Sequence, residues 1–125
     1  MPQTVRDVMT GNLLTVPLEA TLVEAARSMR DADIGSVLVM DGDRLHGIVT
    51  DRDLVIRGLA EAQDPFATNV GQVCTSSLTT VAPSDSVEAA AEAMRRDSVG
   101  RLPVVEDGRP VGIVSAGDLA GDRVR

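Results

Sequence analysis

Apolar and polar residues follow two patterns that recur in both halves of the chain. The i, i+3, i+4, i+7 spacing of a half-buried helix is found at Leu22, Ala25, Ala26 and Met29, and again at Val87, Ala90, Ala91 and Met94. Apolar runs broken by an Asp-Gly pair, at 37–49 and 102–114, predict two β-hairpins. We also expect short strands before each helix, at 14–17 and 79–82, and a second helix after each hairpin. Each half is therefore predicted to be β-α-β-β-α.

The two halves form an internal repeat. Residues 5–10 (VRDVMT) return 65 residues later as residues 70–75 (VGQVCT), and the same offset relates the GIV sequences at 47–49 and 112–114. Solenoids need about three or more copies of a repeat. Two copies are better explained as halves that share one core.

The repeat also predicts the boundaries within the chain. The first repeat covers 5–60, a linker covers 61–69, and the second repeat covers 70–121. Thr21, with Glu24 three residues later, has the spacing of a capping box, and Asp85 begins a looser version of it. These two residues are the predicted starts of the first helix in each repeat. The second helices are predicted to begin at Thr50, continuing through Leu59, and at Ser115.

Composition and charge exclude several classes of function. The net charge is −7, whereas proteins that bind nucleic acids or anionic membranes present a basic surface. Every basic residue is arginine, so there is no lysine nucleophile or general base. A single His and a single Cys cannot complete a zinc site within one chain, so we predict no metal and no catalytic residues. The first residues lack the features of a signal peptide, and we expect a cytoplasmic protein.

The repeated motifs resemble those of the cystathionine-β-synthase (CBS) domain. The resemblance rests on VRDVMT at 5–10, on the Thr-Val pairs at 15–16 and 80–81, and on GIVTDRD at 47–53. Two such domains in tandem resemble a CBS pair, or Bateman module. The chain is similar to small stand-alone bacterial CBS-pair proteins, including hypoxia- or stress-response proteins. The resemblance implies an α/β (α+β) fold with the two repeats packed through their sheets about a pseudo-twofold axis, and a homodimer.

The same resemblance implies two ligand clefts that bind adenosine-type molecules such as AMP, ADP, ATP or S-adenosylmethionine. By analogy, one cleft is formed by Asp118, Ser115 and Arg101, with Thr10, Asn12 and Leu13 around the base. The other is formed by Asp53, Thr50 and Ser36, with Thr75 and Leu78. The aspartates would accept hydrogen bonds from the ribose hydroxyls, and the orphan N–H groups at the helix starts would favour phosphate. Arg101, which corresponds to Ser36, and Ala116, which corresponds to Asp51, predict that the first cleft is the better phosphate site.

Each of these residues also has an ordinary structural interpretation. Thr/Ser-x-x-Asp before a helix is an N-cap motif, and Arg101 has the features of a surface arginine at a strand end. His46 is interpreted as a strand residue, and Cys74 as a small buried side chain. Two functions remain open. One is a regulatory module that senses an adenosine-type ligand without needing a cofactor, and the other is a dimeric scaffold with vestigial clefts. Either would act on an effector protein that the sequence does not identify.

Overall fold

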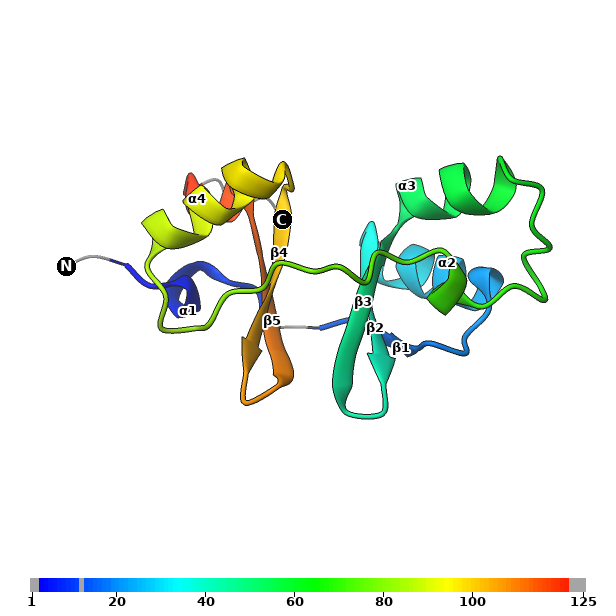
Figure 1. The fold of residues 1–125 in the computed structure, drawn as a ribbon, viewed down its shortest axis with the longest axis horizontal. Coiled ribbons are helices and arrows are strands. Elements are labelled where there is room, and N and C mark those ends of the chain that lie inside the picture. Colours follow the sequence, from blue (N-terminus) through cyan, green and yellow to red (C-terminus); the bar gives the residue numbers. More distant parts are fainter. Residues whose placement is uncertain (1–2, 12, 122–125) are drawn as a thin grey trace. The chain divides into compact units, whose positions relative to one another are not determined.

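The computed structural model describes residues 3–11 and 13–121, and it divides into two compact units. Unit A is Leu14–Leu78, and unit B combines Met1–Leu13 with Thr79–Arg125 (Figure 1). Within the described residues, no helix is long and apolar enough to span a membrane.

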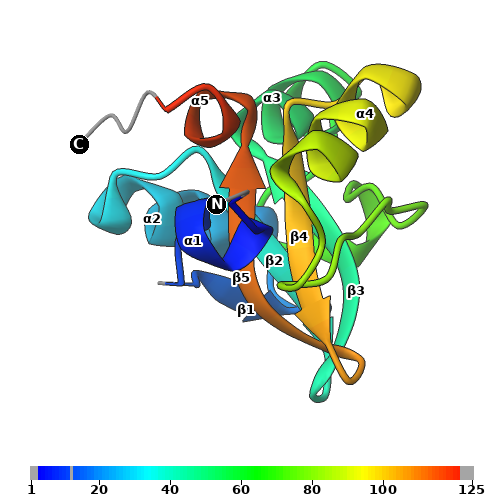
Figure 2. The same ribbon diagram turned by 90° about the vertical axis from the view of Figure 1, so that its left-hand side faces the viewer.

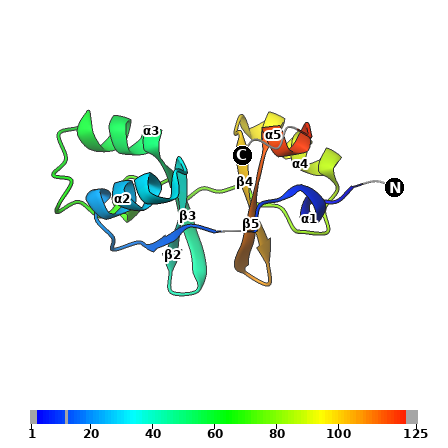
Figure 3. The ribbon, with the colours of Figure 1, turned by 180° about the vertical axis from the view of Figure 1, so that it is seen from behind.

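Unit A is a three-stranded sheet with helices along it (Figure 3). Its elements are β1 (Thr15–Pro17), α2 (Leu22–Ala32), β2 (Ser36–Asp41), β3 (Arg44–Thr50), α3 (Asp51–Asp53), the π-helical turn η1 (Leu54–Leu59) and the 3-10 turn η2 (Val70–Gln72). Strand β2 is central, parallel to β1 and antiparallel to β3. The helix predicted after Thr50 is present as α3 and η1. Its second part, η1, is a wider π-helical turn, in which Ala60 N–H donates to Val55 O at 2.8 Å.

Unit B repeats this arrangement with one fewer strand (Figure 2). Its elements are α1 (Val5–Val8), α4 (Val87–Asp97), β4 (Arg101–Glu106), β5 (Arg109–Ser115) and α5 (Ala116–Leu119). Strands β4 and β5 form an antiparallel hairpin.

The strand predicted at 79–82 is wrong, because this segment makes only a single parallel bridge, from Val81 to Val104. In unit A, Leu38 N–H donates to Leu14 O at 2.9 Å and holds the start of β1. The residue that corresponds to Leu38 is Pro103, which has no N–H to donate to Thr79. The short strand therefore cannot extend toward Thr79.

Helices α2 and α4 begin at capped residues and bury one face. Thr21 forms the predicted capping box, since its Oγ1 accepts from Glu24 N–H at 3.1 Å and its own N–H donates to Glu24 Oε1 at 2.8 Å. The cap of α4 is Ser86, whose Oγ accepts from Ala89 N–H at 3.0 Å, rather than the predicted Asp85. Asp85 instead accepts from Ala82 N–H, within the turn that precedes the helix.

Each unit has its own apolar core, built from the predicted helix faces and hairpins, rather than the single shared core that the repeat predicted. In unit A the members of this core with no exposed surface are Ala25, Val37, Val39, Val49 and Val70, and Leu38 of β2 is fully buried outside this cluster. In unit B the corresponding side chains are Val5, Ala90, Val104 and Val114. Val5 comes from the first sequence repeat but lies in the core of unit B. Val70 comes from the second repeat but lies in the core of unit A.

This exchange is made by two short segments, which we call the straps. Strap B is Met9–Thr10 and lies along β5, where Thr10 and Ile113 exchange backbone hydrogen bonds of 2.9 and 3.0 Å. Strap A is Cys74–Thr75 and lies along β3, where Thr75 and Ile48 exchange bonds of 2.9 and 3.0 Å. The compact units therefore combine parts of both sequence repeats.

Candidate functional site

The first candidate site lies in unit B, where β5 passes into α5. Ser115 is the N-cap of α5, and its Oγ accepts from Asp118 N–H at 3.1 Å. In return, Asp118 Oδ2 accepts from Ser115 N–H at 2.9 Å. Arg101, at the start of β4, is the register partner of Ser115 and is exposed to solvent. Three of the predicted residues therefore lie together at one end of the hairpin.

Strap B approaches the same strand two residues earlier, at Ile113. A Cβ atom on Gly112 would lie 2.9 Å from Thr10 O and 2.7 Å from Met9 Sδ, so this close approach requires glycine. Thr10 is exposed and Leu13 is half-buried. Asn12, which was also predicted to line this site, is outside the described residues.

The second candidate site repeats this geometry in unit A. Thr50 Oγ1 accepts from Asp53 N–H at 3.1 Å, and Asp53 Oδ2 accepts from Thr50 N–H at 2.9 Å. Ser36 is the register partner of Thr50 and is buried, with 3% of its surface exposed. Thr75 lies on strap A, and Leu78, where the unit ends, is half-buried.

The two sites differ in charge. Unit B presents the Arg101 guanidinium where unit A has the buried hydroxyl of Ser36. Unit A also has Asp51, at the position where unit B has Ala116. The Asp51 carboxylate lies close to Gly35, since its Oδ2 would be 3.1 Å from a Cβ atom on that glycine. Arg101 therefore adds a positive charge beside the candidate site of unit B, and Asp51 adds a negative charge beside that of unit A.

Sequence reasoning missed Arg57, which ties strap A to the helix beside it. Its Nη1 donates to Val73 O at 3.3 Å, to Cys74 O at 3.5 Å and to Thr75 Oγ1 at 3.5 Å. The corresponding residue in the second repeat is Asp122, so comparison of the repeats gives no signal for this contact. Unit A therefore also has a positive charge, near strap A. It comes from η1, whereas Arg101 of unit B lies on β4.

The expectation that orphan N–H groups at the helix starts would favour phosphate is largely wrong. The N-cap N–H groups are taken by Asp53 and Asp118, as above. The next N–H groups are also bonded, from Asp51 to Gly35 O at 3.0 Å and from Ala116 to Gly100 O at 2.9 Å. The capping boxes and these backbone bonds therefore satisfy the N–H groups at the two helix starts, and Arg101 is the cationic side chain at this end of the hairpin in unit B.

Cys74 and His46 do not form a chemical centre in the structure. Burial raises the pKa of the Cys74 thiol, which disfavours the reactive thiolate. Cys74 Sγ would lie 2.9 Å from a Cβ atom on Gly47, and it packs beside the core of unit A. His46 is a half-buried residue within β3. Across residues 3–11 and 13–121, no three His, Cys, Asp or Glu side chains are grouped as they would be around a metal ion.

Comparison with known proteins identifies the family. The CBS domain family matches the chain twice, at residues 5–59 and 70–123. The chain belongs to the CBS domain family. The resemblance inferred from the sequence is thereby confirmed, as is the α+β class of the fold, because solved CBS-pair structures match it at a TM-score of 0.86. CBS pairs are regulatory modules that are generally not enzymes and often bind adenosyl ligands.

Several relatives are similar over most of the CBS pair. Hypoxic response protein 1 of Mycobacterium tuberculosis is 40% identical over 118 residues, which are 94% of this chain and 82% of that protein. A crystal structure of hypoxic response protein I with two coordinated zinc ions has a TM-score of 0.86 at 38% identity, covering 97% of this chain and 99% of that one. A hexameric CBS-CP12 protein from bloom-forming cyanobacteria has a TM-score of 0.86 at 27% identity, covering 96% of this chain and 67% of that one.

One solved structure of the same fold contains adenosyl ligands. The CBS domain pair of the protein MJ0100, in complex with 5′-methylthioadenosine and S-adenosylmethionine, has a TM-score of 0.86 at 24% identity. It covers 97% of this chain, and the present chain covers 95% of it. At this identity the likeness concerns the fold alone.

Proposed function

We propose that this protein is a regulatory module that binds an adenosine-type ligand at Asp118 in unit B and at Asp53 in unit A. The proposal rests on the hydrogen bonds of the Asp53 and Asp118 carboxylates, each of which uses one of its two oxygens in the helix cap. Each Oδ2 accepts from the N-cap N–H, and no described residue donates to either Oδ1. A carboxylate oxygen has two lone pairs, so one Oδ1 can accept from both the 2′- and 3′-hydroxyls of a ribose.

The charges of the two sites favour different ligands. Arg101 supports a phosphorylated nucleotide such as AMP, ADP or ATP in unit B, whereas Asp51 in unit A opposes one. We therefore assign the better phosphate site to unit B, with Ser115 and strap B beside it. The site in unit A is assigned to a neutral or cationic adenosyl compound such as S-adenosylmethionine. No cofactor and no catalytic step is part of this function.

Calorimetry at fixed salt tests the assignment. Asp118→Ala is expected to remove most AMP binding, and Asp53→Ala to have a smaller effect. Arg101→Ala is expected to weaken AMP about tenfold or more and to leave adenosine nearly unchanged, because a hydrogen bond to a charged group contributes about 1.5–3 kcal/mol. Asp85→Ala is the matched control, since its carboxylate accepts from Ala82 N–H in the turn before α4 and takes no part in the cap of α5. Loss of AMP binding in Asp53→Ala alone would reverse the assignment.

We also propose that the protein is a homodimer that acts on an effector protein. Apolar side chains exposed on unit A favour this part of the proposal, and they equally support the second candidate function, a dimeric scaffold whose clefts bind no ligand. The two functions separate in a thermal-shift panel of AMP, ADP, ATP, S-adenosylmethionine and NAD. A ligand that binds the folded state raises the melting temperature. If none does so at millimolar concentration, the scaffold function replaces the sensor.

A further inference from the structure

Strap A is held by two different elements of unit A. Thr75 exchanges two backbone hydrogen bonds with Ile48 of β3. From η1, a single atom of Arg57, Nη1, donates to three oxygen atoms, those of Val73 O, Cys74 O and Thr75 Oγ1. These three bonds are long, at 3.3, 3.5 and 3.5 Å, so each is weak by itself. The guanidinium acts by joining three consecutive residues, and it fixes the strap to η1 as well as to the hairpin.

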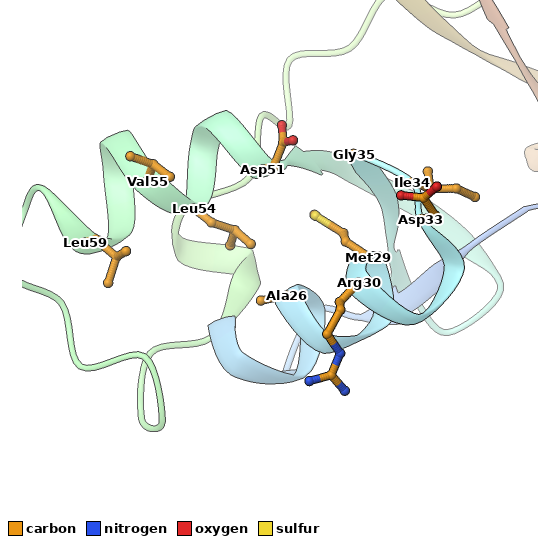
Figure 4. Close-up of a pocket in the computed structure, with 10 residues that line it drawn as sticks. All are labelled: Ala26, Met29, Arg30, Asp33, Ile34, Gly35, Asp51, Leu54, Val55 and Leu59. Atoms are coloured by element: carbon orange, nitrogen blue, oxygen red, sulfur yellow. The ribbon is translucent and has the colours of Figure 1, made fainter. Parts of the chain in front are cut away.

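The turn that carries Arg57 is itself anchored. Leu54 packs against the core of unit A, and with Met29 it lines the open groove between η1 and α2 (Figure 4). Gly58, which follows Arg57, is buried, and a Cβ atom there would lie 2.9 Å from Leu22 Cδ1. Close packing before and after Arg57 restrains its backbone, so its side chain is a fixed point for the strap.

This contact lies beside the carboxylate that we propose binds the ribose. Strap A meets β3 at Ile48, two residues before Thr50, which caps the helix together with Asp53. Both nearby charges act on the Cys74 thiol of the strap. Burial is the main cause of its raised pKa, Asp53 raises that pKa further, and Arg57 lowers it. Arg57, strap A and Asp53 are therefore neighbours within one unit.

The second repeat does not supply the same side chain for strap B. The residue that corresponds to Arg57 is Asp122, which is outside the described residues, and an ionised carboxylate has no proton to donate. The two straps also differ in exposure, since Thr75 is half-buried and the equivalent Thr10 is exposed. The contact with Arg57 is thus a property of unit A.

We propose that Arg57 is a positioning residue, which holds strap A in place for an adenosine-type ligand bound at Asp53. The inference rests on the proposed function of unit A and adds the residue that prepares its site. Because Thr75 Oγ1 accepts from Arg57, the hydroxyl proton of Thr75 is left to donate, and no described residue accepts it. The ring nitrogens of adenine are acceptors for such a donor. A strap that is already ordered costs the ligand less on binding.

Alkylation of Cys74 by iodoacetamide tests the contact without any ligand. Arg57→Met keeps an unbranched side chain and removes the donors, and we expect it to make the reaction about three- to tenfold faster. Loss of the Arg57 charge alone would slow the reaction, since Arg57 lowers the pKa of this thiol and its removal leaves less thiolate. Arg57→Lys restores a donor and is expected to recover part of the protection. Arg52→Met is the matched control, because the exposed Arg52 guanidinium of α3 makes no hydrogen bond with a described residue.

Calorimetry with S-adenosylmethionine tests the consequence for the ligand. In an Asp118→Ala background the proposed site of unit B is removed, so the binding that remains is assigned to Asp53. Adding Arg57→Met is expected to weaken this binding about three- to tenfold, and Arg57→Lys to recover part of the loss. S-adenosylmethionine carries a net positive charge, so removal of a nearby positive charge would by itself strengthen binding. Weaker binding therefore reports displacement of the strap, and circular dichroism establishes that the variants are folded.

Three results would contradict the proposal, each at a different step. If Cys74 reacts at the same rate in Arg57→Met as in Arg52→Met, Arg57 does not hold the strap. If the reaction accelerates but S-adenosylmethionine binds as tightly as before, Arg57 contributes to structure only and has no positioning role. If the Asp118→Ala protein itself binds no S-adenosylmethionine, the proposed function of unit A fails, and this inference fails with it.

Discussion

Replacement of Gly47 by alanine tests whether the straps are as tightly packed as the structure shows. A Cβ atom at this position would lie 2.6 Å from Thr75 O and 2.9 Å from Cys74 Sγ. Both distances are shorter than an ordinary contact, and the nearer atom belongs to the backbone, which cannot rotate away. Strap A must therefore move off β3, and its two hydrogen bonds with Ile48 must lengthen or break.

The expected cost follows from these two effects. Overpacking a well-packed site costs about 1–3 kcal/mol, and each weakened hydrogen bond costs about 0.5–1.5 kcal/mol. We therefore expect Gly47→Ala to lower the free energy of unfolding by about 2–6 kcal/mol. For a chain of this length that lowers the melting temperature by about 8–24 °C. Gly112→Ala is expected to cost less, because its shortest contact, 2.7 Å, is to the flexible side chain of Met9.

Urea denaturation of three variants measures the effect. Gly100→Ala is the control, since a Cβ atom there meets nothing within 4 Å. It is expected to be neutral or to stabilise the protein by up to about 1 kcal/mol, through the unfolded state. If Gly47→Ala unfolds within about 0.5 kcal/mol of Gly100→Ala, the straps do not lie against the hairpins as described, and the reasoning about both sites fails with them.

Two further predictions concern single titratable groups. Hydrogen bonds from the backbone and side chain of Thr21 lower the pKa of Glu24, so its charge stabilises the folded state above that pKa and stops doing so as the pH falls through it. The Glu24→Gln protein should therefore melt at a lower temperature than the unmutated protein at pH 7, and the difference in melting temperature should disappear in acid. A difference that stays constant down to pH 2 would contradict the capping argument. Burial raises the pKa of the Cys74 thiol, so its alkylation by iodoacetamide at pH 7 should be slower than that of free cysteine and should accelerate in urea. Equal rates with and without urea would show that the thiol is not packed as described.

The sequence predicts most of the secondary structure because its signals are local. Helix spacing, the capping box at Thr21 and the Asp-Gly hairpins depend on residues close together in the chain, and the structure contains all of them. The strand predicted at 79–82 failed because its partner is Pro103, about twenty residues away. The π-helical turn after Asp53 was missed because a helical apolar pattern does not distinguish the two kinds of turn.

Packing of the straps was not predictable from the repeat. Similarity at an offset of 65 residues shows that Thr10 and Thr75 are equivalent, but it does not show which hairpin each one contacts. Resemblance to CBS pairs grouped Thr10 with Asp118 and Thr75 with Asp53, and the structure places each pair within one compact unit. Whether these residues bind a ligand remains a prediction.

Capping and ligand binding at the two aspartates use different atoms of the same side chain. Oδ2 of Asp118 holds the start of α5, whereas Oδ1 is the atom that would accept from a ribose. The Ser-x-x-Asp pattern is therefore the same whether the aspartate only caps the helix or also binds a ligand. The spacing of the residues does not distinguish these two cases. The residues that do separate them are those with no part in the cap. Arg101 is exposed at the strand end beside Ser115, and it takes no hydrogen bond of the capping box. Its presence in unit B and its absence from the equivalent position in unit A, together with Asp51 in unit A, make the two sites chemically distinct, although their caps are the same.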